Sequence, residues 1–237
     1  MVKEIDEIQK MRVAGRLTAR VLEAVDDLIA PGITTAEIDI FCERFIIETL
    51  RARPGSKGQY GYPFTVNTSV NHVVCHGMPS PTQVLRRGDI VNVDVTVIHD
   101  GFYGDSSKMF CVPPVPGHAL RLVGVAQQCL YKGIRIVEPG ATIGDIGSVI
   151  QKHAEENHCS VVREYCGHGI GKEMHEAPQV VHFGTPGSGM KLLPGMTFTI
   201  EPMINQGKRA VKLLKDGWTV VTRDRRLSAQ WEHTVLV

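Results

Sequence analysis

The chain contains two aspartates, Asp94 and Asp105, that a β-hairpin would place on one face of a sheet. Residues 89–98 alternate valine with polar residues, so Asp94 points away from the valines. Asp100-Gly101 is a strong hairpin-turn signal. A turn centred there places Asp105 on the diagonal from Asp94, and a turn one residue earlier places it directly opposite. Like charges on one face destabilise a sheet, so the pair predicts a bound cation, although a solvated face without a function explains the hairpin equally well.

Two unrelated motifs occur twice in the chain with nearly the same offset, which predicts an internal repeat. The pairs are residues 31–38 with 139–146, and residues 88–94 with 195–201. The repeat aligns Asp94 with Glu201, and the last predicted strand carries Glu232. Packing two similar halves about a pseudo-twofold axis would bring four carboxylates together. Such a cluster needs at least one divalent metal ion, and two ions suit four acids better.

The composition excludes several classes of protein. The 237 residues include 26 basic and 25 acidic side chains, and the net charge of +1 gives no bias toward nucleic acid or an anionic membrane. No run of roughly 18 apolar residues is present, so no transmembrane helix is expected. The six cysteines are scattered without a CxxC motif, which indicates neither a zinc ribbon nor a disulfide framework. A reducing cytoplasm is the simplest setting.

Hydrophobic periodicity and turn residues predict an α+β fold in which helices flank a sheet. The two halves of the repeat span about 1–115 and 116–237 within a single domain. In each half a Pro-Gly turn and a capping threonine begin the second helix. The predicted helices are residues 4–30, 34–50, 118–137 and 142–157. The other predicted strands are residues 65–70, 73–75, 160–164, 179–181 and 197–200, with a closing hairpin near 218–222 and 231–237.

Three of the ten histidines are candidates for chemistry. His168 lies among three glycines, and His76 precedes a glycine in the first half. Glycine permits close approach of the backbone to a ligand, although a histidine in a glycine-rich turn more often has no function. His175 follows in the same segment as His168, whereas His233 adjoins Glu232 on a strand and therefore points to the opposite face. His99 lies in the predicted turn, and no distinctive context surrounds His72, His118, His153, His158 or His182.

Six segments resemble signature segments of the type I methionine aminopeptidases: residues 75–79 (CHGMP), 91–96 (VNVDVT), 104–108 (GDSSK), 165–171 (YCGHGIG), 194–202 (PGMTFTIEP) and 228–234 (SAQWEHT). The resemblance covers nearly the whole chain. It implies the pita-bread fold, whose two pseudo-symmetric halves agree with the repeat. Glu201 and Glu232 lie too close in sequence to hold the helical insert of type II relatives. The implied activity is removal of the initiator methionine from new chains, preferentially before a small second residue.

The resemblance also implies residue roles. The ligands of two divalent metal ions would be Asp94, Asp105, His168, Glu201 and Glu232. Glu201 would also serve as general base and proton carrier, His175 would stabilise the oxyanion, and His76 would contact the amide of the departing residue. Four carboxylates and one imidazole suit Mn, Fe(II), Co or Zn, and the sequence does not choose among these metals.

The implied pocket for the methionine side chain departs from the family pattern. Its residues would be Gln59, Tyr62, Asn67, His76, Met174, His175 and Trp218, with Phe198 as a further candidate. Gln59 stands where relatives often have Tyr, Asn67 where many have Cys, and Met174 where Phe is common. Ser56 replaces a Cys that some relatives carry. A more polar and adaptable pocket would hold methionine less tightly, and neutral drift is the alternative explanation.

Two other functions remain open at this point. A proline-directed peptidase such as prolidase has the same fold but carries an extra N-terminal domain, for which we expect no room here. A non-enzymatic pita-bread binding protein would be expected to lose metal ligands, and all five are present. For an aminopeptidase, the expected partners are the N-termini of nascent polypeptides, with the ribosome as the site of encounter. A cytoplasmic monomer without nucleic-acid specificity or membrane attachment is expected.

Overall fold

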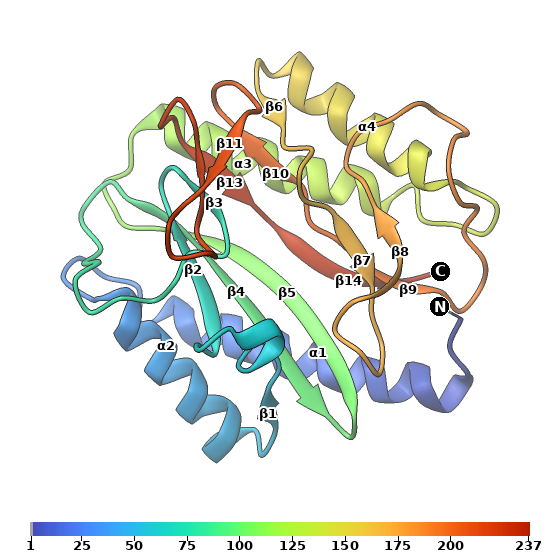
Figure 1. Ribbon diagram of the computed structural model, residues 1–237, viewed down its shortest axis with the longest axis horizontal. Helices are drawn as coiled ribbons and strands as arrows, with labels where there is room; N and C mark the ends of the chain where they lie inside the picture. Colours follow the sequence, from blue (N-terminus) through green and yellow to red (C-terminus); the bar gives the residue numbers. More distant parts are fainter. Residues whose placement is uncertain (1) are drawn as a thin grey trace.

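A long antiparallel sheet runs through the centre of the molecule and joins the two halves of the chain (Figure 1). The computed structural model describes residues 2–237. The strands of this sheet are β1 (Arg53–Pro54), β2 (Val66–Val70), β4 (Ile90–His99), β5 (Phe102–Cys111), β7 (Gly167–Gly169), β8 (Glu176–Val180), β9 (Thr197–Ile200) and β14 (Glu232–Leu236). Their order is β1-β4-β5-β14-β9-β7-β8, and β2 also pairs with β4. The contact between β5 and β14 is therefore the junction of the first and second halves.

Two small sheets complete the β-structure. One contains β13 (Ser228–Gln230), β10 (Met203–Asn205) and β6 (Ser160–Val161), and the other contains β11 (Val211–Leu213), β12 (Val220–Thr222) and β3 (Val73–Cys75), each in that order. The predicted closing hairpin is wrong, because β12 pairs with β11 and β3 whereas β14 pairs with β5 and β9. Between β5 and β9, β14 has hydrogen-bonding partners along both edges, which satisfies its backbone groups better than one hairpin partner would.

In the part of the chain that the structure describes, four α-helices flank the sheets, so the predicted α+β class is confirmed (Figure 1). They are α1 (Ile5–Asp26), α2 (Thr35–Arg44), α3 (Gly117–Ile134) and α4 (Ile143–Glu156); a π-helical turn, η1 (Phe45–Thr49), extends α2, and a 3₁₀ turn, η2 (Gln59–Gly61), precedes β2. α1 packs on β4 and β5, α2 contacts β2, and α3 packs on α4, β9 and β13. Within residues 2–237, none of the helices combines the length and the apolarity needed to cross a membrane.

Each pair of helices covers its own hydrophobic core. In the first half, apolar residues of α1 and α2 bury Val91, Val93, Val95 and Val97 of β4. In the second half, α3 and α4 pack on residues that include Phe198 and Ile200 of β9. The alternation that predicted a valine face on β4 is therefore confirmed, and the polar side chains of β4 lie on the opposite face.

The repeated Pro-Gly motifs form the same local structure in both halves. Thr34 accepts a hydrogen bond from the backbone N–H of Glu37, and the Glu37 carboxylate accepts one from the backbone N–H of Thr34. Thr142 and Asp145 make the same reciprocal pair. These capping boxes satisfy backbone donors that a helix N-terminus otherwise leaves free, which explains why α2 and α4 begin where the sequence predicts.

Candidate metal and substrate site

The predicted hairpin consists of β4 and β5 and turns at Asp100-Gly101, where φ is 48° and 77°. Thr96 pairs with Asp105 across the two strands, so Asp94 lies on the diagonal from Asp105, which is one of the two predicted arrangements. The valines of β4 are buried in the first core, whereas both carboxylates line a cavity on the other side of the sheet. The hairpin therefore brings two acids to one place.

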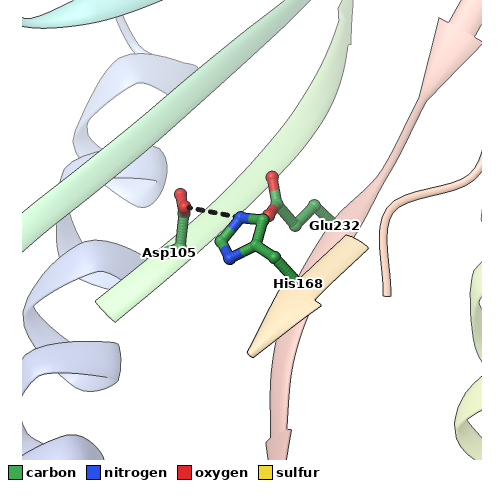
Figure 2. Close-up of side chains that lie close together, drawn as sticks. All are labelled: Asp105, His168 and Glu232. Carbon is green, nitrogen blue, oxygen red and sulfur yellow. Dashed lines mark ion pairs between the residues drawn. The ribbon is translucent and has the colours of Figure 1, made fainter. Parts of the chain in front are cut away.

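The other three predicted ligands come from the second half of the chain. Glu232 begins β14 beside β5, and Glu201 directly follows β9 on the other side of β14. His168 lies on β7, and one ligand atom each of Asp105, His168 and Glu232 falls within 4.8 Å of the others (Figure 2). Nε2 of His168 is also 3.6 Å from Oε1 of Glu201. The acids thus meet where the two halves of the sheet join.

The glycines around His168 serve the sheet rather than a ligand. A Cβ atom at Gly167 would lie 2.3 Å from the carbonyl oxygen of Thr199, and one at Gly169 would lie 2.1 Å from that of Ala177. Both distances are far below van der Waals contact, so only glycine lets β7 lie between its neighbours. The glycines were predicted to let the backbone approach a ligand, but they let β7 approach the neighbouring segments of the same chain instead. This packing sets the position of the His168 ring.

The buried environment shifts the acid–base properties of the cluster. Burial is the largest cause of a raised pKa for each carboxyl: Asp94 to about 7, Glu201 to about 8, and Asp105 and Glu232 well above the usual range. Burial also lowers the pKa of His168 to about 4, so the imidazole is neutral at pH 7 and free to bind a metal. No lysine or arginine is among the described residues that line the cavity. The oxygen-rich, anionic donor set fits divalent transition-metal ions, which would compensate the buried charges.

Removal of divalent metal should therefore make stability depend on pH. In the metal-free protein the pKa of Glu201 is raised to about 8, so the folded state holds protons that the unfolded chain releases. The contribution of Glu201 to stability is therefore fully present below its unfolded pKa of about 4.3 and is lost as the pH rises through about 8. We expect the Tm of chelated protein to fall between about pH 7.5 and pH 8.5, above the unfolded histidine pKa of about 6.5.

Manganese added to the chelated protein should abolish most of this fall, because the bound cation favours the ionised carboxylates. The Glu201→Gln variant is the matched control, since it contains one buried acid fewer and should show a shallower fall. Thermal unfolding monitored by circular dichroism provides the measurement. A Tm that does not change with pH in the chelated wild type would contradict the expected proton binding.

The cavity above the acids has a volume of about 510 Å³, within the range typical of small-molecule sites. It is lined by all the residues assigned from the sequence to metal, catalysis or the pocket: Gln59, Tyr62, Asn67, His76, Asp94, Asp105, His168, Met174, His175, Glu201, Trp218 and Glu232. The further candidate Phe198 does not line it. Phe198 is fully buried in the second core because its side chain points to the opposite face of β9 from the cavity-facing residues.

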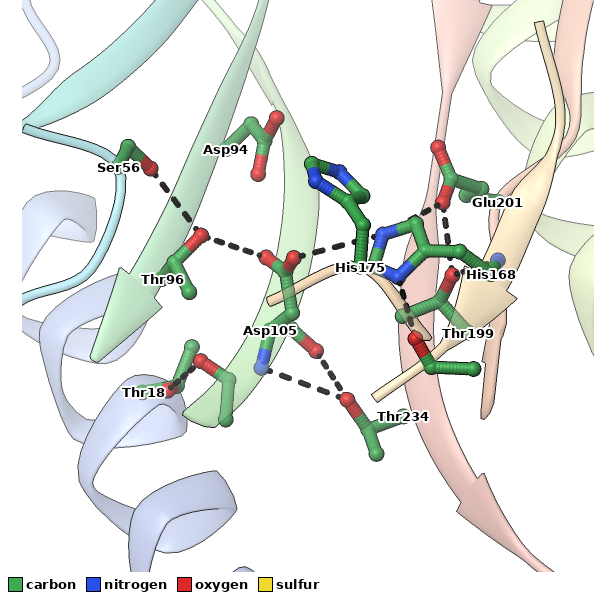
Figure 3. Close-up of polar contacts among 12 residues, drawn as sticks. Thr18, Ser56, Asp94, Thr96, Asp105, His168, His175, Thr199, Glu201 and Thr234 are labelled. Atoms are coloured by element: carbon green, nitrogen blue, oxygen red, sulfur yellow. Dashed lines mark hydrogen bonds and ion pairs between the residues drawn. The ribbon is translucent and has the colours of Figure 1, made fainter. Parts of the chain in front are cut away.

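Hydrogen bonds orient the carboxylates (Figure 3). Thr199 donates from Oγ1 to Oε1 of Glu201 over 2.7 Å, and Gln230 donates to Oε2 over 3.3 Å. The backbone N–H of Glu201 donates to Nε2 of His182, a fully buried histidine. Sequence reasoning missed these three contacts. Thr199 lies two positions before Glu201, and residues two apart in an extended chain share one face, so the sequence does indicate the contact between them. Nothing in the sequence around His182 indicates its contact with Glu201.

His175 is held between two aromatic rings at the mouth of the cavity. Its ring packs edge-on against His168, with centroids 4.2 Å apart, and its Nδ1 lies 3.2 Å from the hydroxyl of Tyr60. Tyr60 is a second residue that sequence reasoning missed; it lies in the left-handed region, with φ of 49°, between the predicted residues Gln59 and Tyr62. His76 also lines the cavity and packs against Tyr165, and burial lowers its pKa to about 4.

The aromatic wall of the cavity is formed by Tyr62 and Trp218, whose rings meet edge-on with centroids 4.9 Å apart. The hydroxyl of Tyr62 donates to the carbonyl oxygen of Val66, so its polar atom is satisfied within the protein and the ring adds apolar surface to the wall. Met174 packs against the apolar cluster around Ile170 at another part of the wall. His233 points away, toward Tyr131 and Ser106, as its position next to Glu232 predicts.

Comparisons with known proteins agree with this geometry. Residues 9–237 match the model of metallopeptidase family M24. The methionine aminopeptidases of Escherichia coli (strain K12) and Salmonella typhimurium (strain LT2) are 51% and 53% identical to the chain, in alignments that cover 100% of this chain and 89% of each relative. The crystal structure of methionine aminopeptidase from Rickettsia prowazekii has a TM-score of 0.98 at 47% identity, covering 100% of this chain and 95% of that one.

A more distant similarity extends to prolidase. The prolidase from Pyrococcus furiosus has a TM-score of 0.78 at 18% identity and covers 100% of this chain and 62% of its own, which shows a shared fold alone. The predicted pita-bread fold is therefore confirmed, and the high identities lie with the methionine aminopeptidases and not with the proline-directed enzymes. The chain belongs to metallopeptidase family M24 and, within it, to the methionine aminopeptidases.

Proposed function

We propose that this protein is a metal-dependent aminopeptidase that removes the initiator methionine from peptides and nascent proteins, preferentially before a small second residue. The observation that carries the proposal is the position of the buried acids and His168 at the base of a cavity whose wall is aromatic. The acids can hold a metal next to the cleaved bond, and the aromatic wall suits an apolar side chain. Both features occur in a chain that belongs to the methionine aminopeptidases.

We assign Asp94, Asp105, His168, Glu201 and Glu232 as the ligands of two divalent ions, from Mn, Fe(II), Co or Zn. Such ions supply Lewis acidity and lower the pKa of water. Glu201 acts as general base and then transfers the proton to the leaving amine. Burial raises the pKa of the metal-free Glu201 carboxyl to about 8, and bound cations would lower it, which keeps the carboxylate ionised and able to accept a proton. Thr199 and Gln230 hold the Glu201 carboxylate in position for this role.

Two histidines that line the cavity position the peptide bond. His175 donates a hydrogen bond to the oxygen on which negative charge develops, and His76 contacts the amide of the departing residue. When the Tyr60 hydroxyl donates a hydrogen bond to Nδ1 of His175, the ring proton is on Nε2, and this is the tautomer in which Nε2 can donate. The negative charge of the acids suits the free α-amine of a substrate, which explains restriction to the first residue of a chain.

The methionine pocket contains the residues that depart from the family pattern. Gln59 donates from Nε2 to the hydroxyl of Tyr103 over 2.8 Å, so its polar group is directed toward a partner in the wall. We expect the Gln59→Tyr, Met174→Phe double variant to have a lower KM for methionyl peptides, because rigid aromatic rings specify a pocket better than flexible chains. It should also discriminate more strongly against norleucine. Steady-state kinetics on a Met and norleucine tripeptide pair test this, and identical constants would show that the two substitutions are neutral for methionine binding.

We further propose that the substrates are met at the ribosome by a cytoplasmic monomer. The exposed basic side chains of the segment around β11 and β12 could approach ribosomal RNA phosphates: Lys208, Arg209, Lys212, Lys215, Arg223, Arg225 and Arg226. The two acids in this segment, Asp216 and Asp224, accept hydrogen bonds from nearby backbone N–H groups. Cosedimentation with ribosomes that weakens steeply with salt would support this encounter.

The decisive experiment begins with metal-free protein. Chelated enzyme is tested against Met-Ala-Ser and against peptides with proline at the second or third position, with each divalent ion restored in turn. We expect cleavage of Met-Ala-Ser only after an ion is restored. Preferential cleavage at proline would favour a prolidase-like activity instead, and absence of cleavage with every ion would favour a binding protein.

A further inference from the structure

Two residues that the family resemblance marks as departures lie beside the proposed metal ligands: Asn67 hydrogen bonds to Asp94, and Ser56 hydrogen bonds to Thr96, which in turn bonds to Asp105. We propose that Ser56 and Asn67 are positioning residues for the metal centre, which orient Asp105 and Asp94 by hydrogen bonding and so couple the pocket wall to metal affinity. The proposal rests on the proposed function, because it takes both aspartates as metal ligands. It assigns Ser56 and Asn67 an effect on metal binding in addition to any effect on the methionine side chain.

Ser56 acts on Asp105 through Thr96 (Figure 3). Oγ of Ser56 lies 3.1 Å from Oγ1 of Thr96, and Oγ1 of Thr96 lies 3.0 Å from Oδ1 of Asp105. A carboxylate bound to a metal only accepts hydrogen bonds, so Thr96 must give its single proton to Asp105. The hydroxyl of Ser56 is then the donor to Thr96. All three residues are buried, so water does not compete for these bonds.

The backbone before Ser56 keeps this chain of hydrogen bonds in place. β1 pairs with β4, and the N–H of Gly55 donates to the carbonyl oxygen of Thr96 over 2.8 Å. A Cβ atom at Gly55 would lie 2.6 Å from Cγ2 of Thr96, so a larger residue would push this segment away from β4. The close contact of Gly55 with Thr96 therefore holds the hydroxyl of Ser56 within bonding distance.

Asn67 acts on Asp94 directly. The two residues are cross-strand partners between β2 and β4, and Nδ2 of Asn67 donates to Oδ2 of Asp94 over 3.1 Å. Asn67 is only 7% exposed, so its amide points inward, toward the acid. Hydrogen bonds to an ionised acceptor are about twice as strong as neutral ones, and a thiol at this position would be a much weaker donor.

Groups that hydrogen bond to metal ligands are known to change metal affinity by about 10–100-fold when they are replaced. We therefore expect Asn67→Leu and Thr96→Val each to weaken binding of Co²⁺ to chelated protein by about this factor. Ser56→Ala should cause a smaller loss, since it acts through Thr96. Titration followed by Co²⁺ absorption measures affinity without any need for activity. Gln59→Leu is the matched control, because Gln59 lines the same cavity but hydrogen bonds to Tyr103 and not to a carboxylate. The Co²⁺ affinity of this variant should equal that of the wild type.

A double variant tests whether Ser56 acts through Thr96. Adding Ser56→Ala to Thr96→Val should cause no further loss of Co²⁺ affinity, because the intermediate hydroxyl is already absent. Independent, additive losses would contradict the hydrogen-bond chain. Circular dichroism checks folding, and Asn67→Ala replaces Asn67→Leu if the larger side chain prevents folding.

Each outcome has a distinct meaning. Variants that bind Co²⁺ like the wild type while KM changes would overturn the proposal and leave Ser56 and Asn67 as pocket residues only. Wild-type protein that binds no Co²⁺ would instead contradict the proposed function itself. Weaker Co²⁺ binding in the variants, with normal binding in the Gln59→Leu control, would establish the coupling.

Discussion

Glu201→Gln should reduce the turnover of Met-Ala-Ser by at least about 100-fold while the protein stays folded. The substitution keeps the shape of the side chain, and its carbonyl oxygen can still accept the hydrogen bond from Thr199. It removes the group that accepts and releases the proton, together with one of the negative charges that would hold the metal ions. The measurement is kcat in the metal-restored enzyme, with circular dichroism to verify the fold.

The control for this variant is Glu156→Gln, an exposed carboxylate at the end of α4, far from the cavity lining. It should leave kcat unchanged. The metal content of Glu201→Gln must also be measured, because a loss of ions alone could lower activity. Retention of a tenth of the wild-type kcat or more, with ions bound, would rule out Glu201 as general base.

His175→Ala should lower kcat by about 10²–10³-fold, equivalent to about 2.7–4 kcal/mol, and leave KM nearly unchanged. The reason is that charge on the substrate oxygen develops only in the transition state, so the donor contributes little to substrate binding. A fall in affinity with kcat preserved would make His175 a binding residue instead.

Tyr60→Phe provides a graded companion to the His175 prediction. It removes the hydroxyl next to Nδ1 of His175 but keeps the aromatic ring that packs on the imidazole. We expect a smaller loss of kcat than in His175→Ala, because the imidazole remains but its tautomer is no longer selected. Nitrogen NMR of ¹⁵N-labelled histidine reports the tautomer of His175 directly. An unchanged spectrum in Tyr60→Phe would show that the Tyr60 hydroxyl does not select this tautomer.

Local sequence patterns predicted the elements that carry the site. The alternation of residues 89–98 placed Asp94 and Asp105 on one face, and register confirms a common face for them on β4 and β5. The capping threonines Thr34 and Thr142 predicted the starts of α2 and α4. These predictions succeed because side-chain parity and helix capping depend on residues within a few positions of one another.

Contacts between distant segments were harder to predict. The closing hairpin was predicted wrongly because backbone hydrogen bonds form whatever the side chains are. The hydrophobic pattern of a strand therefore does not indicate which other strand it pairs with. Phe198 was a pocket candidate, but its neighbours in β9 place it in the core. Tyr60 and His182 carry no local signal, since each is defined by a contact with a residue far away in the chain.

By itself, the sequence determined which acids and histidines this protein has for its chemistry, which face of its strand each occupies, and the family to which its motifs are similar. The tertiary structure alone decided that β14 enters between β5 and β9 and so brings Glu232 beside Asp105 and Glu201. It also decided that the acids are buried, which raises their pKa values, that Asn67 bonds to Asp94, and that Ser56 bonds to the Thr96 hydroxyl beside Asp105. Burial and strand pairing are properties of the packed chain, because each depends on segments that only folding brings together.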